Sequence, residues 1–297
     1  MKRMAFKAIR YETEGRVATI TLNCPEKRNP FNVQMRQDMV AAFDLADADD
    51  EVRAIIVTGE GPAFCAGADL GPGGREQMEQ RYSAVTRPDG TIDYAAEAGR
   101  DGAGLVALRI YRCLKPVIGA INGPAVGAGA TITLPMDVRV AADTARFGFI
   151  FSRIGLVPEG ASTYFLPRLI GVPKALDWLF SGRFVSADDA REAGMVQRIV
   201  PPGELLATAR AIAQGYIEGT SAVSMALIRQ MIWRGIAMTD PMEAHKVEAW
   251  ALLARGRGGD FEELRSARGE GRGPRFTDRV SNGMPDFFPW WVDPDYA

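Results

Sequence analysis

The chain has 297 residues, of which 47% are hydrophobic and 24% charged, proportions that are ordinary for a globular protein. Its formal net charge of −2 gives no general electrostatic basis for binding nucleic acid or an anionic membrane surface. A run of about 18 apolar residues is absent, and residues 1–10 lack the apolar segment of a secretory signal, so the sequence predicts no membrane span and no secretion.

The first elements have clear signals. Short β-branched runs at 11–13 and 17–22 predict an opening hairpin. Asn32 is typical of a helix N-cap. The helix that follows repeats apolar residues every three to four positions, at Met35, Met39, Phe43 and Ala46.

The middle of the chain alternates strands and helices. Residues 54–58, 116–121 and 138–141 predict buried strands, and 105–114 and 128–134 predict helices between them. Residues 71–100 are polar and poorly periodic, which predicts a mobile lid or excursion that is helical in part.

Helical patterns dominate the rest of the chain, at 162–170, 174–180, 187–193, 204–214, 221–234 and 242–253. The arginine-rich residues 255–279 predict a solvated face, and the aromatic tail 286–291 is expected to pack on its own core or on a neighbouring subunit. The pattern therefore predicts an α/β core over residues 1–202 and a C-terminal helical region with an aromatic tail over 203–297.

Two segments of small residues are the most informative feature of the chain. Residues 120–133 read Ala-Ile-Asn-Gly-Pro-Ala-Val-Gly-Ala-Gly-Ala-Thr-Ile-Thr, and residues 64–70 read Phe-Cys-Ala-Gly-Ala-Asp-Leu. Small residues let a substrate carbonyl approach the main chain closely. Two convergent backbone N–H groups, one of them at the start of a helix, stabilise an oxygen that becomes negative. The pair of segments therefore predicts chemistry through an enolate or oxyanion.

Histidine and cysteine usage narrows the chemistry further. His245 is the only histidine, and it lies in a helical pattern far along the chain from both small-residue segments, so the catalytic base is expected to be a carboxylate. Cys24, Cys65 and Cys113 are widely spaced without a Cys-x-x-Cys motif. They predict reduced thiols in the cytoplasm, with neither a disulfide nor a zinc site.

Six motifs in order resemble the crotonase superfamily, also called the enoyl-CoA hydratase/isomerase family. The resemblance runs from about Tyr11 to about Leu253, and its motifs are residues 28–32, 66–69, 115–123, 143–148, 155–160 and 187–200. It implies an α/β fold, a crotonase-like spiral of β-β-α units, with a C-terminal helical region that trimerises. The implied substrate is a coenzyme A thioester, the implied assembly is a homotrimer or a dimer of trimers, and no separate cofactor or metal is implied.

The resemblance also assigns residues. The N–H groups of Ala68 and Ala128 match the oxyanion hole for the thioester carbonyl, and Arg28 matches the region that contacts the adenosine diphosphate of coenzyme A. The remaining substrate contacts that it implies are Ala66, Asp69, Leu70, Gly127, Thr131 and Phe151.

The sequence departs from the family's hydratases at two positions. Thr131 and Phe151 stand where a typical 2-enoyl-CoA hydratase has the two glutamates that hold and activate water. Glu159 instead matches the base of one group of Δ3,Δ2-enoyl-CoA isomerases. The sequence thus favours a double-bond shift from Δ3 to Δ2, in which Glu159 takes a proton from C2 and returns it at C4. A hydratase or another crotonase-type lyase, non-catalytic binding of coenzyme A esters, and a loop glutamate at 159 that only caps the helix at Ser162 remain alternatives.

Overall fold

The computed structural model describes residues 6–68 and 71–296. Its main sheet has six strands, with β1 and β2 antiparallel and all other neighbours parallel. In spatial order the strands are β1 (Ile9–Glu14), β2 (Val17–Leu22), β4 (Ala54–Gly59), β6 (Val117–Ile121), β8 (Val138–Ala142) and β11 (Arg198–Val200). The predicted opening hairpin is confirmed, as are the three buried strands of the middle region.

A second layer consists of strands of only two or three residues. They are β3 (Pro30–Phe31), β5 (Gly67–Ala68), β7 (Ala125–Val126), β9 (Arg146–Gly148) and β10 (Phe184–Ser186). β3 pairs with β5, β9 pairs with β7 and β10, and an isolated bridge between Cys65 and Ala125 joins the two groups. Each long strand from β2 to β8 is followed by one of these short strands and then by a helix, so the chain repeats a β-β-α unit.

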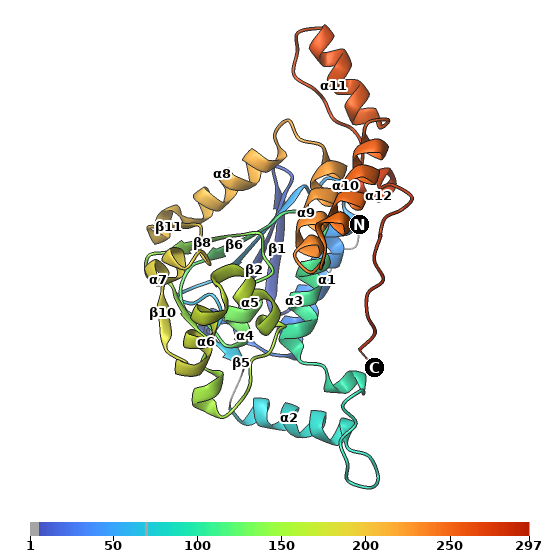
Figure 1. Ribbon diagram of the computed structural model, residues 1–297. Coiled ribbons are helices and arrows are strands. Elements are labelled where there is room, and N and C mark those ends of the chain that lie inside the picture. The colour runs from blue at the N-terminus through green and yellow to red at the C-terminus, as the bar shows by residue number, and fades with distance from the viewer. Residues whose placement is uncertain (1–5, 69–70, 297) are drawn as a thin grey trace.

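Helices lie around both layers, and some of them extend well away from the sheets (Figure 1). They are α1 (Val33–Ala48), α2 (Pro72–Val85), α3 (Gly102–Arg112), α4 (Ala128–Thr131), α5 (Ser162–Ile170), α6 (Val172–Ser181), α7 (Ala187–Glu192), α8 (Leu205–Ile217), α9 (Ala222–Gly235), α10 (Pro241–Arg255), α11 (Gly259–Gly269) and α12 (Val280–Gly283). Four 3-10 turns complete the described elements, η1 (Pro25–Lys27), η2 (Glu97–Gly99), η3 (Phe151–Ile154) and η4 (Pro202–Glu204). None of the helices in the described residues is long and apolar enough to cross a membrane.

Local signals explain where α1 begins and which way it faces. The Asn32 side chain accepts a hydrogen bond of 2.9 Å from the Met35 N–H, which confirms the predicted N-cap. The four apolar residues of its repeat are fully buried in the larger core cluster. That cluster fills the space between the main sheet, the second layer and α1 and α3.

The opposite face of the main sheet is covered by α8, as Figure 1 shows. Leu205, Ala209 and Ala213 of α8 lie against Ile56 of β4 and Ile118 of β6 in a separate core cluster. This helix follows the predicted boundary at residue 202, yet it packs on the sheet of the preceding region. The division into 1–202 and 203–297 itself stays a prediction.

Two segments differ from the sequence prediction. The predicted helix at 128–134 ends at Thr131, and residues 132–136 continue it as turns. Residues 255–279, expected only as a solvated face, contain α11, where the chain pairs its own charges: Arg272 lies 2.5 Å from Glu263 and Arg255 lies 2.6 Å from Asp278. The first pair ties Glu263 of α11 to the segment that follows the helix, and the second joins the residues on either side of it.

The aromatic tail packs on the chain itself. Phe287, Phe288 and Trp290 join the cluster formed by α9 and α10. Farther along, the Arg234 guanidinium lies 4.0 Å from the centre of the Trp291 ring. The tail then runs outside α3 towards the excursion that contains α2 and η2 (Figure 1), where Arg100 lies 5.4 Å from the centre of the Tyr296 ring.

Candidate active site

Two asparagines hold the loop that leads into the small-residue segment 64–70. The Asn29 side chain is fully buried; it accepts from the Cys24 N–H and donates to the carbonyls of Glu60, Ala63 and Phe64 at 2.9 to 3.2 Å. Asn122 accepts from the Gly59 N–H at 3.1 Å and donates to the Gly61 carbonyl at 2.8 Å. Because these bonds satisfy the loop's backbone, they fix the path of the chain before β5.

The two small-residue segments meet, as the sequence predicts. The Cys65 carbonyl accepts a hydrogen bond of 2.9 Å from the Val126 N–H. A Cβ atom on Gly67, whose φ is +87°, would lie 2.5 Å from the Val126 carbonyl oxygen. Only glycine combines this backbone conformation with such an approach. β5 therefore lies directly against the segment that leads into α4.

Ala68 and Ala128 both lie where the two small-residue segments meet. Ala68 is exposed at the end of β5, which packs against α4. Ala128 is the first residue of α4, and the hydrogen bonds of this short helix start with the donors Ala130 and Thr131, both to the Gly127 carbonyl. The Ala128 N–H thus has no acceptor within its helix. This placement suits an oxyanion hole, whose assignment stays a prediction.

Some of the other predicted substrate contacts lie next to Ala68 in the structure. Ala66 is exposed, and its N–H donates to the Arg28 carbonyl at 2.9 Å, so the Arg28 backbone helps to place the segment. The Arg28 side chain is itself exposed, and its contact with coenzyme A stays a prediction. The predicted contacts Asp69 and Leu70 lie outside the described residues.

Thr131 and Phe151 are both buried, Thr131 within the small-residue segment 120–133 and Phe151 three residues after β9. The Thr131 hydroxyl donates to the Ala128 carbonyl at 3.2 Å within α4, and Phe151 begins the 3-10 turn η3. Neither side chain titrates, so neither supplies the carboxylate that a two-glutamate hydratase site requires at these positions.

Glu159 lies in a sharp turn that rests on α4. Gly160 and Ala161 have φ values of +70° and +52°, and a Cβ atom on Gly160 would lie 2.7 Å from the Thr131 hydroxyl oxygen. Main-chain positions of this kind are costly for L-residues such as Ala161 and often occur at functional sites. The turn therefore places Glu159 next to the helix that carries Ala128.

The Glu159 side chain does not cap the helix that follows it. The N-cap of α5 is Ala161, and no side chain bonds to the first turn of that helix. Only the Glu159 backbone takes part, accepting from the Ser162 N–H at 3.2 Å. The structure thus contradicts the helix-capping alternative for this carboxylate.

The surroundings of Glu159 favour its protonated form. Burial, the largest cause, and the negative charge of Asp101 raise the pKa of Glu159 to about 7, against the opposing positive charge of Arg81. Burial also raises the pKa of the Cys65 thiol to about 12, and the charge of Glu159 adds to that effect. Glu159 is therefore electrostatically coupled to the residue that precedes the segment Ala66–Ala68. A carboxyl with a pKa near 7 is suited to act as base and acid in turn near neutral pH.

Asp101 is the residue that sequence reasoning missed at this site. Its Oδ1 atom accepts from the Gly104 N–H at 2.5 Å, as the N-cap of α3, and from the Gly160 N–H at 3.0 Å. The N-cap was visible as an aspartate before an apolar repeat. Its bond to Gly160, 59 residues later, has no signal in the sequence.

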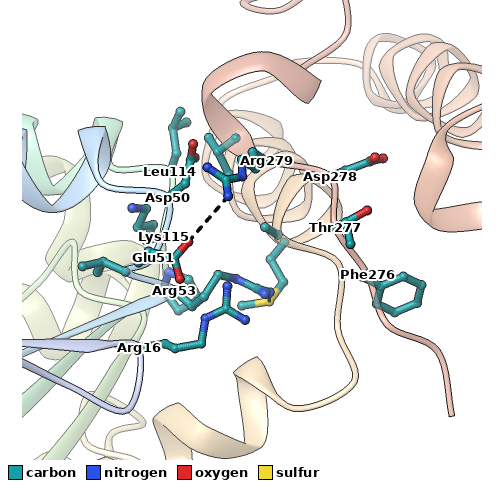
Figure 2. A pocket seen from close by; sticks show the side chains of 15 residues that line it. Arg16, Asp50, Glu51, Arg53, Leu114, Lys115, Phe276, Thr277, Asp278 and Arg279 are labelled. Carbon is teal, nitrogen blue, oxygen red and sulfur yellow. Dashed lines mark hydrogen bonds and ion pairs between the residues drawn. The ribbon is translucent and has the colours of Figure 1, made fainter. Parts of the chain in front are cut away.

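A cavity of about 180 Å³ lies elsewhere, between the main sheet and the C-terminal region (Figure 2). Arg16 and Arg53 contribute cations to its wall, and Glu51 forms an ion pair of 3.8 Å with Arg279 across it. None of the predicted site residues lines this cavity, so it is separate from the candidate active site.

The single histidine lies in a helix of the C-terminal region, apart from the small-residue segments. His245 is exposed on α10, as the helical pattern predicts. Cys24, Cys65 and Cys113 are all free thiols, which agrees with the prediction of reduced cysteines.

Comparison with known proteins identifies the family. A model of the family described as enoyl-CoA hydratase/isomerase matches residues 12–246. The chain belongs to the enoyl-CoA hydratase/isomerase family of the crotonase superfamily. The predicted crotonase-like α/β fold is thereby confirmed, and the family acts on acyl-CoA thioesters.

Several named members of the family are similar to this chain. An enoyl-CoA hydratase of Alternaria alternata is 38% identical over 265 residues, covering 89% of this chain and 84% of the relative. The 1,2-epoxyphenylacetyl-CoA isomerase of Escherichia coli K12 is 33% identical over 264 residues, covering 89% and 96%. The crystal structure of an enoyl-CoA hydratase from Bacillus anthracis superposes with a TM-score of 0.78 at 28% identity, covering 91% of this chain and 99% of that one.

Proposed function

We propose that this enzyme shifts the double bond of a 3-enoyl-CoA to the 2-position, with Glu159 as the single acid/base. The observation that carries the proposal is the Glu159 turn, which rests on α4 and holds a carboxyl with a pKa of about 7. Thr131 and Phe151, at the positions of the two hydratase glutamates, add no carboxylate. One titratable group at the reacting carbons suffices for a proton shuttle but supplies only half of a two-carboxylate hydration site.

The reaction follows in two proton transfers. The N–H groups of Ala68 and Ala128 bind the thioester oxygen and stabilise the negative charge that develops there. The Glu159 carboxylate removes a proton from C2, and the electrons of that C–H bond form a dienolate. The protonated Glu159 then delivers the proton to C4 as the carbonyl re-forms, leaving the double bond between C2 and C3. No water and no redox equivalent is consumed.

The electrostatics of Glu159 match both steps. With a pKa of about 7, the carboxyl is populated in both protonation states near neutral pH. The base is therefore stronger than an exposed glutamate, and its conjugate acid still forms readily. Leu156 and Val157, exposed apolar residues that closely precede Glu159 in the chain, are suited to contact an acyl chain.

Hydration of a 2-enoyl-CoA is the second candidate. It is favoured by the relatives whose names are enoyl-CoA hydratase and by the carboxylate of Asp101, which is close enough to Glu159 to affect its ionisation. Hydration requires one group to activate water and one to protonate the substrate. Oδ1 of Asp101 already accepts two backbone hydrogen bonds, so we rank isomerisation first. Binding of acyl-CoA esters without turnover is the remote alternative.

Assembly and location form part of the same proposal. Ile228, Ile232, Leu252 and Leu253 of the C-terminal helices expose between 58% and 76% of their surface. Apolar side chains gathered on such helices favour burial against other subunits, in agreement with a homotrimer or a dimer of trimers.

The free thiols favour the cytoplasm as the location of the protein.

Mass spectrometry in heavy water distinguishes these functions. The protein is incubated with a 3-enoyl-CoA and, separately, with a 2-enoyl-CoA. Conversion of the 3-enoyl ester into a product that co-elutes with the 2-enoyl ester, without the mass of an added water, supports the isomerase; deuterium in that product measures how far the Glu159 proton exchanges with solvent. Addition of one water to the 2-enoyl ester, without isomerisation of the other, would overturn it in favour of the hydratase. No reaction with either ester would also contradict the proposal.

A further inference from the structure

We infer that Asp101 is a positioning residue for the reaction, which holds the turn of Glu159 in place over α4. The inference rests on the proposed role of Glu159 and adds a residue to it. Oδ1 of Asp101 is shared between the Gly104 N–H of α3 and the Gly160 N–H of the turn, at 2.5 and 3.0 Å. One oxygen atom thus ties the start of a helix to the residue next to the base.

The turn is held from two further sides at the same residue. A Cβ atom on Gly160 would lie 2.7 Å from the Thr131 hydroxyl oxygen in α4 and 3.4 Å from Cβ of Ala103 in α3. Packing on α3 and α4 therefore limits how close the turn lies, and the bond to Asp101 limits how far it moves away. Because Gly160 follows Glu159 directly, these contacts set the direction in which the Glu159 side chain leaves the backbone.

Asp101 also affects the ionisation of Glu159 through its negative charge. Among residues 6–68 and 71–296, the charged and titratable groups that act on Glu159 are Asp101 before α3, Arg81 in α2, and the buried thiol of Cys65. Asp101 favours the protonated carboxyl and Arg81 favours the carboxylate. Arg81 also donates to the Ala98 carbonyl at 3.3 Å, so it is attached to the segment that leads to Asp101. A negative charge beside the base keeps the carboxyl able to return its proton.

Three variants separate positioning and charge from simple helix capping. Asp101→Ser keeps a good N-cap for α3 but has a shorter side chain and no charge. Asp101→Asn keeps the acceptor oxygen at the same reach and removes only the charge. Glu248→Gln, an exposed carboxylate on α10, is the matched control for loss of an acid.

Two measurements on the full chain do not depend on turnover. Hydrogen–deuterium exchange reports the Gly160 amide, and ¹³C NMR of labelled glutamate carboxyls reports the titration of Glu159, whose signal the Glu159→Gln variant identifies. We expect faster exchange at Gly160 in Asp101→Ser, wild-type exchange in Asp101→Asn, and a lower pKa of Glu159 in both. Loss of the charge lowers the pKa of Glu159 whether or not Asp101 holds the turn, so exchange at the Gly160 amide is the deciding measurement. A helix cap alone would leave that exchange unchanged in Asp101→Ser, and wild-type exchange at Gly160 in this variant would overturn the inference.

Steady-state kinetics of the same variants test whether Asp101 affects catalysis. With a 3-enoyl-CoA, we expect Asp101→Ser to lower kcat by roughly 10-fold through misplacement of the base, with little change in KM. Asp101→Asn is expected to recover most of this loss and to shift the pH profile to lower pH. If the wild type acts on no enoyl-CoA, the proposed function fails, while exchange at Gly160 still decides the role of Asp101.

Discussion

Gly160 and Thr131 approach each other so closely that a methyl group does not fit between them. A Cβ atom on Gly160 would lie 2.9 Å from Cβ of Thr131, well inside van der Waals contact. This contact joins the turn of the proposed base to the helix of the proposed oxyanion hole. Substitutions at this contact and at Glu159 therefore test how the site is built.

Substitution of Gly160 by alanine is expected to damage both stability and activity. The new methyl group must displace Thr131, and φ of +70° adds strain, so we expect a loss of about 2–4 kcal/mol in the free energy of unfolding. Gly155→Ala is the matched control, because φ is +71° there but nothing lies within 4 Å. It should cost only about 1–2 kcal/mol. Equal losses in chemical denaturation would show that the contact with Thr131 is unimportant.

Glu159→Gln is expected to lower kcat by roughly 10²–10⁴-fold while acyl-CoA binding is largely retained. The amide keeps the size of the side chain but takes up no proton from C2. Turnover is measured by chromatographic separation of the 2-enoyl and 3-enoyl esters, and binding by calorimetry with a substrate analogue. Glu248→Gln, on the exposed side of α10, should behave as the wild type. Undiminished turnover in Glu159→Gln would remove this residue from the mechanism.

The ionisation of Glu159 makes stability depend on pH. Its pKa rises from an ordinary 4.5 to about 7 in the folded protein, so the folded state holds the proton more tightly. This contribution is fully present below pH 4.5 and is lost as pH rises through about 7. We therefore expect Glu159→Gln to gain in Tm relative to the wild type between pH 5 and pH 8. An unchanged Tm difference across this range would contradict the raised pKa. Activity that requires the carboxylate should rise over the same interval.

Arg229 of α9 is expected to be a major determinant of stability. It is buried, forms an ion pair of 2.8 Å with Asp137, and donates to the carbonyls of Tyr111 and Ile110 at 2.9 Å. Arg229→Met would take the buried cation away from Asp137 and remove one donor from each of the two carbonyls, so we expect a loss of about 3 kcal/mol or more. Arg265→Met, which breaks an exposed pair with Glu262, should cost less than about 0.5 kcal/mol. Urea denaturation compares the two, and a similar small effect in both would refute the assignment.

Removal of residues 286–297 is expected to lower stability and solubility. It uncovers Val223 and Leu227 and deletes the three aromatic side chains that pack on them, which we expect to cost about 2–4 kcal/mol. Removal of residues 294–297 alone keeps that cluster and serves as the control. Tm and light scattering measure the outcome. A long deletion with the Tm and the oligomeric mass of the full chain would contradict the prediction.

The parts of the fold that sequence reasoning found are those in which the local pattern and the final packing agree. The apolar repeat from Met35 to Ala46 predicts α1 because all four side chains face the same core. The short strands β3, β5 and β7 have no such signal, since two residues are too few for alternation and pairing with distant segments alone defines them. α11 was missed because its composition is polar and its support comes from ion pairs.

The candidate site was predictable to a similar extent. Small residues at Gly67 and Ala128 have a local chemical meaning, and Glu159 was found through its motif. The bond from Asp101 to Gly160 spans 59 residues and depends on how two loops fold back on each other. A sequence pattern states which groups are present, but their electrostatic environment follows only from the folded chain.

The path of the C-terminal tail has a practical consequence for every experiment described above. Tyr296 lies against Arg100, and Arg100 directly precedes the carboxylate that holds the turn of the base. A purification tag or fluorescent protein fused after this tyrosine would begin its linker close to Arg100, one residue before Asp101. A difference in pH profile between such a fusion and the untagged chain would measure how strongly the tail affects the site.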